Sequence, residues 1–292
     1  MADIASVNAV AAASIASING VAKAAIANLD GMVMVAAASG ATLWTLVGAD
    51  GGVGTAPASD LNSWVGYVSG SMGNADYNSI AYGKDGNGDP LWVAVNSNNN
   101  NEIRYSSDPS AGIGAWTNAT NANDKMLGVA WGNNVWIAVG KLGEVRRSTD
   151  GATWSLLNLS GVTGWVNNVN AWDVVSDGAG KWMFCQGMNV FLSTDDGSTW
   201  SRVVDLSGGS YISDTGYLGV TMSYTASRWC VVLRKTGQSR AYHAASTATG
   251  TWTASTYAGG YPLASQYLVS TSGPVRMAAA NGVVIIASAN DT

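Results

Sequence analysis

The chain repeats one pattern along most of its length, and this repeat constrains the fold more than any other feature. In the clearest copy, two apolar segments with a tryptophan each, separated by a Gly-Asn-Asn turn, fill residues 127–140. The copy ends in the string Ser-Thr-Asp-Gly-Ala-Thr-Trp at residues 148–154. A longer copy covers residues 174–200, and weaker copies cover residues 79–117 and 218–252. Such self-similarity indicates an architecture built from one repeated supersecondary unit.

Each copy has room for about four short strands, bounded by Gly, Asn and Asp as in antiparallel meanders. A single sheet of this kind cannot bury both of its faces, whereas radial stacking of several sheets can. The 36 glycines, the 13 tryptophans and a charged fraction of only 11% suit a chain that buries a large β core. The sequence therefore predicts an all-β fold, a β-propeller.

The two ends of the repeat region each hold half a copy. Residues 275–287 resemble its first half, and residues 32–44 resemble the half that is then missing. We therefore expect five blades, with the N- and C-terminal strands sharing the closing blade. The stretch at residues 45–78 leaves room for a sixth. In this interpretation residues 32–292 form the propeller, and a short Ala-rich attachment segment, residues 1–31, precedes it.

The closing string resembles the Asp-box, or BNR, repeat of sialidase-like propellers. Residues 193–200 match Ser-x-Asp-x-Gly-x-Thr-Trp in full, and residues 148–154 are one residue shorter. The resemblance covers most of residues 32–292 and implies a hairpin, not an activity. We expect the aspartates to accept bonds from turn amides, the glycines to adopt turn dihedrals and the tryptophans to pack between blades. The residues with this role are Ser148, Asp150, Gly151, Trp154, Ser193, Asp195, Gly197 and Trp200.

No catalytic, cofactor or metal constellation stands out. Glycosidases use opposed carboxylates, but the two glutamates, Glu102 and Glu144, recur in the same register of neighbouring copies, as expected of residues that serve the blade. The single histidine, His243, has no second ligand at zinc spacing. Residues 85–89 resemble a calcium loop, although a plain turn is the favoured interpretation. We predict no enzyme, no cofactor and no metal, and keep a sialidase-like hydrolase as the last alternative.

Charge and apolar pattern exclude other partner classes. A net charge of −5 argues against nucleic acid, which needs clustered Lys and Arg. No apolar run is long enough for a membrane helix, and the N-terminus lacks the basic region of a signal peptide. We therefore expect synthesis in a cytoplasm, and buried free thiols at Cys185 and Cys230.

Residues 1–31 carry an 11-residue repeat of their own. Hendecads can form right-handed helical coils, but Asn-Gly at residues 19–20 and Asp-Gly at residues 30–31 favour short extended segments joined by tight turns. An apolar strip this small needs a partner surface, either the same segment in other subunits or another protein. Its candidate attachment residues are Ile4, Val7, Val10, Ile15, Ile18, Val21, Ile26 and Leu29.

The Ile-x-x-Ile-Asn-Gly-Val style of this segment, at residues 15–21, resembles the N-termini of structural proteins of tailed phages. The resemblance implies a virion protein, made in the host cytoplasm, that docks through residues 1–31 and displays the propeller. A tail fibre, a tail tip and a capsid decoration protein all fit, with other virion proteins as partners and a homo-oligomer as the expected state. A glycan-binding lectin outside any virion is the alternative.

Some aromatic residues are not explained by the repeat. Rings on loops beside Asn and Asp can stack on sugars, so a host surface glycan is a candidate ligand. Capping of the propeller surface by these rings is the other interpretation. The candidates are Trp165 and Asn167, which are the strongest, with Trp64, Trp172, Tyr211 and Tyr217.

Overall fold

The fold is described from a computed structural model of the chain. The structure describes residues 6–7, 10–11, 17–18, 21–22, 33–35, 43–57, 59–60, 63–67, 72, 75–96, 103–112, 114–122, 125–205, 221–225, 227–235, 238–247, 249–254, 275–280 and 283–288.

Five four-stranded antiparallel sheets follow one another along the described chain, each a simple meander. Blade 1 contains β5 (Val33–Val35), β6 (Leu43–Val47), β7 (Val53–Pro57) and β8 (Val65–Tyr67). Blade 2 contains β9 (Tyr77–Lys84), β10 (Pro90–Asn96), β11 (Ile103–Ser106) and β12 (Thr117–Asn118). Blade 3 contains β13 (Met126–Gly132), β14 (Val135–Gly140), β15 (Val145–Ser148) and β16 (Ser155–Leu156).

Blade 4 contains β17 (Ala171–Ser176), β18 (Trp182–Gln186), β19 (Asn189–Ser193) and β20 (Ser201–Asp205). Blade 5 contains β21 (Thr221–Thr225), β22 (Arg228–Lys235), β23 (Gln238–Ala245) and β24 (Thr253–Ala254). A two-stranded sheet of β25 (Val275–Ala280) and β26 (Val283–Ser288) follows. Short 3-10 helices lie at η2 (Ala49–Gly51), η3 (Pro109–Ala111) and η4 (Lys141–Gly143).

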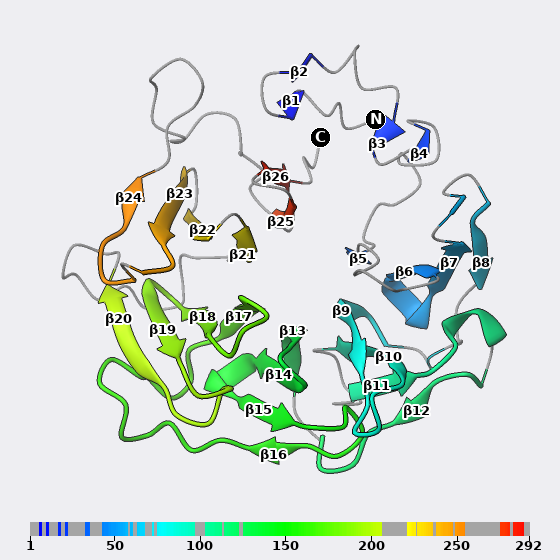
Figure 1. Cartoon of the computed structure of the whole chain (residues 1–292), viewed down its shortest axis with the longest axis horizontal. Helices are drawn as coiled ribbons and strands as arrows, with labels where there is room; N and C mark the ends of the chain where they lie inside the picture. The colour runs from blue at the N-terminus through cyan, green and yellow to red at the C-terminus, as the bar shows by residue number, and fades with distance from the viewer. Residues whose placement is uncertain are drawn as a thin grey trace.

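The sheets are arranged around a common axis, with the first strand of each blade innermost and the fourth outermost (Figure 1). Each first strand contacts the first strand of the next sheet, from β5 through β9, β13, β17 and β21 to β25. This radial stacking of antiparallel meanders confirms the predicted β-propeller.

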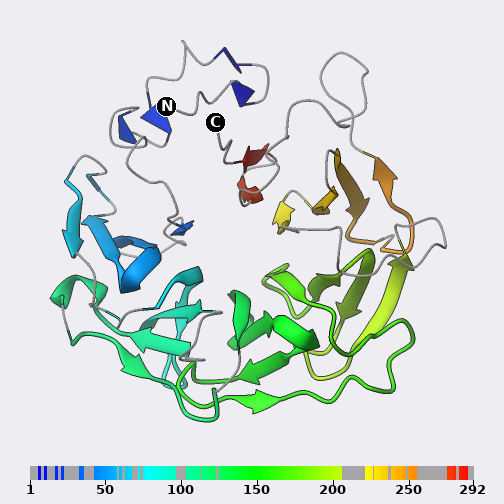
Figure 2. The same cartoon turned by 180° about the vertical axis from the view of Figure 1, so that it is seen from behind.

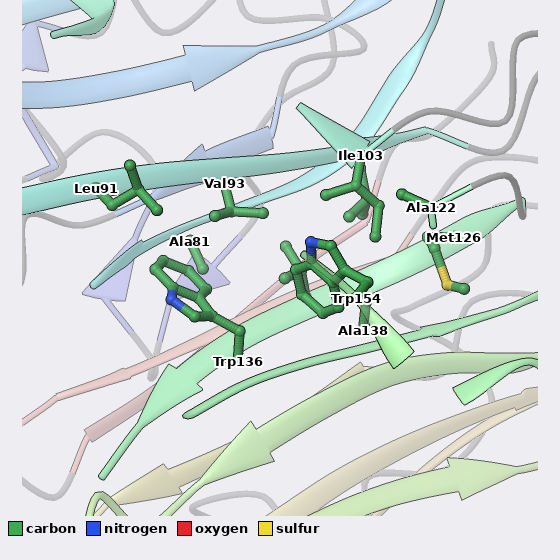
Figure 3. Close-up of a cluster of buried hydrophobic side chains, with 11 residues drawn as sticks. Ala81, Leu91, Val93, Ile103, Ala122, Met126, Trp136, Ala138 and Trp154 are labelled. Atoms are coloured by element: carbon green, nitrogen blue, oxygen red, sulfur yellow. The ribbon is translucent and has the colours of Figure 1, made fainter. Parts of the chain in front are cut away.

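The apolar core lies between successive blades, because alternate residues of a strand face opposite sides of its sheet. On β14, Trp136 and Ala138 face blade 2, whereas Val135, Ile137 and Val139 face blade 4. Figure 3 shows the first of these cores, in which Trp136 and Trp154 of blade 3 lie against Val93 of blade 2. The second-strand tryptophans are buried in four blades, at Trp92, Trp136, Trp182 and Trp229.

The expected sharing of one blade by the two chain ends is wrong. Strand β5 pairs with β6, β6 with β7 and β7 with β8, so residues 33–67 make a complete sheet of their own. Strand β25 pairs with β26. Residues 45–78, which the sequence analysis left as room for a sixth blade, thus supply β7 and β8 to blade 1. The sequence pattern made blade 1 look like half a blade, because blade 1 lacks the full closing string.

Two short antiparallel pairs precede blade 1: β1 (Ser6–Val7) with β2 (Val10–Ala11), and β3 (Ser17–Ile18) with β4 (Val21–Ala22). The described residues of both pairs are extended, and the two pairs repeat at the same 11-residue offset. Both views place them in the arc between β26 and β5 (Figures 1 and 2). Within the described part of the chain, no helix is long and apolar enough to cross a membrane. The candidate attachment residues Ile4, Ile15, Ile26 and Leu29 lie outside the described residues.

Candidate functional site at the connection edge

In a four-stranded meander, the turn between the second and third strands and the connection to the next blade leave from the same edge of the sheet. We call this the connection edge. The longest links between described strands leave from it, at residues 157–170, 206–220 and 255–274. The opposite edge holds short turns and the closing strings. Variable loops on a rigid scaffold are where binding residues concentrate, so the connection edge is the candidate site.

Trp165, the strongest candidate from the sequence, is partly buried in the core between blades 3 and 4. Its ring packs edge-on against Phe184 and Phe191, with centroids 5.9 Å and 5.7 Å away. Its indole N–H donates to Asn167 Oδ1 over 3.2 Å. A Cβ added at Gly143 would lie 2.7 Å from the same ring. Through these contacts the Trp165 ring covers the end of the core between blades 3 and 4 that lies at the connection edge.

Two buried polar side chains hold the connection that carries Trp165. Gln186, at the end of β18, accepts a bond from the Val166 N–H (3.0 Å) and donates to the carbonyls of Val166 (2.9 Å) and Val169 (3.0 Å). Asn189 Nδ2 donates to the Gly164 carbonyl over 3.3 Å. A buried amide is stable when its donors and acceptors are satisfied, so these bonds fix the loop. Sequence reasoning missed Gln186, although a polar residue that ends an apolar strand was a readable signal.

The exposed surface formed by this loop and its neighbours is polar, with one exception. Asn167 and Asn168 are exposed, and Arg202 of β20 is exposed beside Gly164. The exception is Leu142 of η4, which is 60% exposed at a φ of 58°. Its backbone N–H donates to Asn170 Oδ1 over 3.1 Å, and its carbonyl accepts from the Asn168 N–H. The edge of blades 3 and 4 therefore presents a rigid surface rich in amides and hydroxyls.

From the sequence we expected Trp64 outside the repeat, but the structure places it within the repeat. Trp64 directly precedes β8, as Trp154 precedes β16, so it is the closing tryptophan of blade 1. The Ser63 hydroxyl donates to the Asp60 carboxylate just before it.

Trp44, by contrast, lies on β6 in the place that Trp136 holds on β14. In both strands the residue three positions on, Val47 and Val139, pairs with the first residue of the third strand. Trp44 is therefore a second-strand tryptophan, and counting it as a closing one was wrong.

Trp172 lies on strand β17, not in a connection as expected, and packs on the core between blades 4 and 5. Tyr211 and Tyr217 lie outside the described residues. Trp165 and Asn167 thus lie together on the connection edge, Trp172 packs on a different core, and Trp64 lies at the opposite edge. Glycan binding by any of them stays a prediction.

The closing strings at the opposite edge have the predicted hydrogen bonds. In blade 3, the Ser148 hydroxyl donates to Asp150 Oδ1 over 2.9 Å, and the same oxygen accepts from the Ala152 and Thr153 amides over 2.8 Å and 2.7 Å. The Gly151 N–H donates to Ser148 Oγ, and the Trp154 indole donates to the Gly151 carbonyl over 3.0 Å. Burial raises the pKa of Asp150, but the bonds from Thr153, Ser148 and Ala152 outweigh it and hold the pKa below its usual value.

Blade 4 repeats the arrangement. Ser193 Oγ donates to Asp195 Oδ1 over 2.8 Å, and the Thr199 N–H and hydroxyl donate to the same carboxylate. The Gly197 N–H donates to Ser193 Oγ, and the Trp200 indole donates to the Gly197 carbonyl over 3.0 Å. Burial raises the pKa of Asp195 as well, and the Thr199 and Ser193 bonds lower it by more.

The turn at residues 85–89 is a structural element of the repeat. Asp85 Oδ1 accepts from the Asn87 and Asp89 amides over 2.8 Å and 2.9 Å. In blade 4, Asp177 Oδ1 accepts from the Ala179 and Lys181 amides in the same spacing. Since the blade 4 turn ends in lysine, this geometry needs no cation. Among the described residues, no cluster of three or more His, Cys, Asp or Glu could hold a metal ion.

Both cysteines are free thiols, as predicted, with Cys185 buried and Cys230 partly exposed. Burial, together with the negative charge of Asp173, raises the pKa of Cys185 well above its usual value. Burial also raises the pKa of Cys230, against the opposing effect of Arg228. Neither thiol is thereby activated as a nucleophile, because the thiolate is the reactive form.

Similarity to known proteins shows the fold. No protein-family model matches the chain, and no curated protein matches it. A chain of a nidogen–laminin complex is 14% identical with a TM-score of 0.56, over 85% of this chain and 86% of that one. An auxiliary nutrient binding protein from Bacteroides thetaiotaomicron is 10% identical with a TM-score of 0.55, over 88% and 69%.

A structure of YCF48 bound to a D1 peptide is 15% identical with a TM-score of 0.42, over 57% of this chain and about half (51%) of that one. At these identities the two likenesses with the higher TM-scores show the β-propeller fold alone, and the third is too weak to add to them.

Proposed function

We propose that this chain is a non-enzymatic structural protein of a tailed-phage virion, in which residues 1–31 attach the propeller to the particle. The chain could be part of a tail fibre, part of a tail tip, or a capsid decoration protein, and we keep all three as candidates. Its closing strings are of the Asp-box type, and its neighbours in the particle are other virion proteins or further copies of itself.

The observation that carries the proposal is the separation of the N-terminal segment from the propeller sheets. Blades 1 to 5 are each complete from β5 onward, and β1–β4 pair only with one another among the described strands. The pairs Val7↔Val10 and Ile18↔Val21 occupy the same place in successive 11-residue units. Pairs of two residues are too short to be stable in water on their own, so this repeated segment is built to contact something else.

Polar residues in the described blades support a scaffold instead of a catalyst. Arg147 Nε donates to the Asp196 carbonyl over 2.8 Å, and Asn133 Nδ2 donates to Asp196 Oδ1 over 2.8 Å, which joins blades 3 and 4. Lys181 Nζ donates to the Ser246 carbonyl over 3.2 Å, which joins blades 4 and 5. Arg147, Lys181 and Asp196 therefore serve to join neighbouring blades.

Particle incorporation tests this role. Phage particles should be purified on a density gradient from an infected culture. They should contain the chain in a fixed ratio to the major capsid protein, measured by quantitative mass spectrometry. Replacing the apolar pairs, Val7→Ser with Val10→Ser and Ile18→Ser with Val21→Ser, should reduce incorporation at least about tenfold. The control, Ser6→Ala with Ser17→Ala, changes the neighbouring residues and should incorporate normally. Normal incorporation of the apolar-pair variant would contradict attachment through this segment.

Self-association is tested separately by light scattering on purified protein. If the segment joins copies of the chain, the full-length protein elutes as an oligomer and the protein lacking residues 1–31 as a monomer. If both are monomers, attachment is to a different virion protein.

The connection edge is the face that we propose for contact with host surface glycans. The exposed amide of Asn167 and the hydroxyls of the 157–170 connection provide the hydrogen-bonding groups that sugars need. Asn167→Ala should weaken binding on a glycan array, whereas Asn158→Ala, an exposed asparagine of the same connection, should not. Equal signals for wild type and both variants would remove this surface from consideration. A glycan-binding lectin outside a virion, the alternative, predicts array binding without particle incorporation.

A further inference from the structure

Two turns at the connection edge, residues 48–52 of blade 1 and residues 140–144 of blade 3, have the same backbone. In each turn the N–H of the first residue donates to the carbonyl of the fifth, over 3.1 Å in blade 1 and 2.8 Å in blade 3. The third residue has a left-handed φ in both, 52° at Asp50 and 58° at Leu142. The two turns are therefore copies of one structural element, on blades that are separated in the ring by blade 2 (Figure 1).

The same side-chain contact holds both turns. The Leu142 N–H donates to Asn170 Oδ1 over 3.1 Å, and the Asp50 N–H donates to Asp76 Oδ1 over 3.0 Å. Asn170 directly precedes β17, and Asp76 directly precedes β9, so each acceptor comes from the start of the next blade. Because the backbone and this contact are shared, the fold does not require the differences between the side chains of the two turns.

These differences change the charge of the surface. Blade 1 exposes two carboxylates, those of Asp50 and Asp76. Blade 3 has the uncharged Leu142 and Asn170 in their places, and Lys141 adds an ammonium group directly before Leu142. The same element is thus acidic in one blade and cationic in the other.

Leu142 is not explained by packing or by backbone preference. Its side chain is 60% exposed, and leucine tolerates a left-handed φ less well than the aspartate of blade 1 does. Residues held in an unfavourable conformation on a rigid backbone concentrate at binding and catalytic sites. An exposed apolar side chain in a surface of amides and charges is therefore a candidate contact for a ligand.

Two further cations flank the connection at residues 157–170. Lys125 is exposed, and its carbonyl accepts from the Lys141 N–H over 2.8 Å. On the other side of the connection, Arg202 is exposed beside Gly164, and its Nη1 donates to Asn189 Oδ1 over 3.3 Å. The bond to a buried neutral amide positions the guanidinium and leaves its charge uncompensated by that partner.

The carboxylates nearby are directed into the protein. Among the described side chains at this edge of blades 3 and 4, they are those of Glu144 and Asp173. Glu144 Oε2 is buried, and Asp173 accepts from the Val174 and Met222 amides. This edge therefore presents exposed cations in a chain whose net charge is −5.

We propose that Lys125, Lys141, Leu142, Asn167 and Arg202 form a binding surface for an anionic polysaccharide. This inference rests on the proposed glycan contact and names the class of glycan. The three cations bind carboxylate or phosphate groups along the polymer, and the planar guanidinium suits either group. The apolar face of a sugar ring packs on Leu142, and the Asn167 amide bonds to hydroxyls. We call these five residues the cationic surface.

Binding of defined polymers to purified full-length protein tests the class of ligand. The probes are polygalacturonate, which carries carboxylates, polyglycerol phosphate, which carries phosphates, and neutral dextran. By biolayer interferometry, at least one anionic polymer should bind at least about tenfold more tightly than dextran, and salt should weaken that binding because it screens exposed charges. The preferred polymer identifies which anionic group the surface takes. Absence of binding to both anionic polymers, or equal binding to dextran, would overturn the proposal.

A turn exchange locates the binding. Lys141→Ala with Leu142→Asp and Asn170→Asp gives the blade 3 turn the residues that blade 1 has at the same places. Since blade 1 folds with these residues, the variant should keep its near-UV circular dichroism and melting temperature while its affinity for the anionic polymer falls at least about tenfold. The control, Lys84→Ala, removes an exposed lysine at the opposite edge and should change affinity by less than about twofold.

Exposed single substitutions provide a second test that does not depend on the exchanged turn. Lys125→Gln and Arg202→Gln should each weaken binding of the anionic polymer at least about threefold. Wild-type affinity in the turn exchange and in both of these variants would overturn the assignment of this surface.

Failure of this inference is distinguishable from failure of the proposed glycan contact. If Asn167→Ala loses glycan-array signals that the turn exchange retains, the connection edge binds glycans without the cationic surface, and only the anionic class is wrong. If neither variant changes any glycan signal, both the contact and the class are wrong. Particle incorporation is measured independently of both.

Discussion

The Asp173 carboxylate spans the boundary between blades 4 and 5, where its Oδ2 accepts a hydrogen bond from the backbone N–H of Met222 over 2.8 Å. Its Oδ1 accepts from the N–H of Val174 over 2.9 Å. Ser79 holds the equivalent position in blade 2 and accepts from the Val129 N–H of blade 3 over 3.3 Å. First strands do not pair with one another by a ladder, so these side chains provide the polar contacts between them.

Removing this contact should weaken the junction of blades 4 and 5. Asp173→Ala leaves the amides of Val174 and Met222 without their acceptor, and an unsatisfied buried donor costs about 1–3 kcal/mol. We expect the free energy of unfolding in urea to fall by about that amount. Thr194→Ala, at an exposed site of the same blade, is the control and should change it by less than about 0.5 kcal/mol. Equal values for the two variants would show that the contact contributes nothing.

The closing strings should make stability depend on pH in the acid range. The pKa of Asp150 is lower in the folded chain than its ordinary value. Its ionised form therefore stabilises the fold above the unfolded pKa of about 3.9, and that contribution is lost as pH falls through the lower folded value. Asp150→Asn should lower the melting temperature at pH 7, and the difference from wild type should shrink below about pH 3.5. Thr149→Val, the exposed neighbour, should show no pH-dependent difference, and a constant gap for Asp150→Asn would contradict this origin.

Trp165 should contribute to stability through its ring. Trp165→Ala removes the edge-on contacts with Phe184 and Phe191, and truncation of a packed aromatic costs about 3–5 kcal/mol when the residue is fully buried. For this partly buried ring we expect about 2–3 kcal/mol, measured by chemical denaturation. Trp165→Phe keeps a ring in the core and loses the bond to Asn167, so it should cost less than half as much. A stable Trp165→Ala protein would show that the ring is held in place without contributing to the fold.

Leu142 should be replaceable with a gain in stability. A φ of 58° is costly for leucine, and the side chain is 60% exposed. Asp50 holds the corresponding position in blade 1 with a φ of 52°, and Asp and Asn tolerate this conformation better. We expect Leu142→Asn to raise the free energy of unfolding by about 0.5–1 kcal/mol. Leu156→Asn removes a similarly exposed leucine from an ordinary strand, so it controls for the loss of surface apolarity and should give no gain.

The strongest repeats were readable from sequence because each blade uses the same local chemistry. Asp150 and Asp195 form their bonds within a few residues, so the closing strings predicted both the hairpins and the place of Trp154 and Trp200.

Sequence left undecided whatever depends on register between distant strands. Trp44 and Trp64 both follow strand-like residues, and only the pairing of β6 with β7 shows that the first is a second-strand tryptophan and the second a closing one. In the candidate site, Asn167 was identified as a loop residue, but its bond to Trp165 and the buried amide of Gln186 beneath it were not.

The sequence by itself determined the repeated unit, its β character and the N-terminal segment of different periodicity, because these follow from contacts between residues close along the chain. Tertiary structure alone decided that blade 1 is complete, that β25–β26 form a separate sheet, and that Asp173 joins two blades. Those features rest on which strand edge lies beside which, and that choice is made by the packing of whole sheets around the axis.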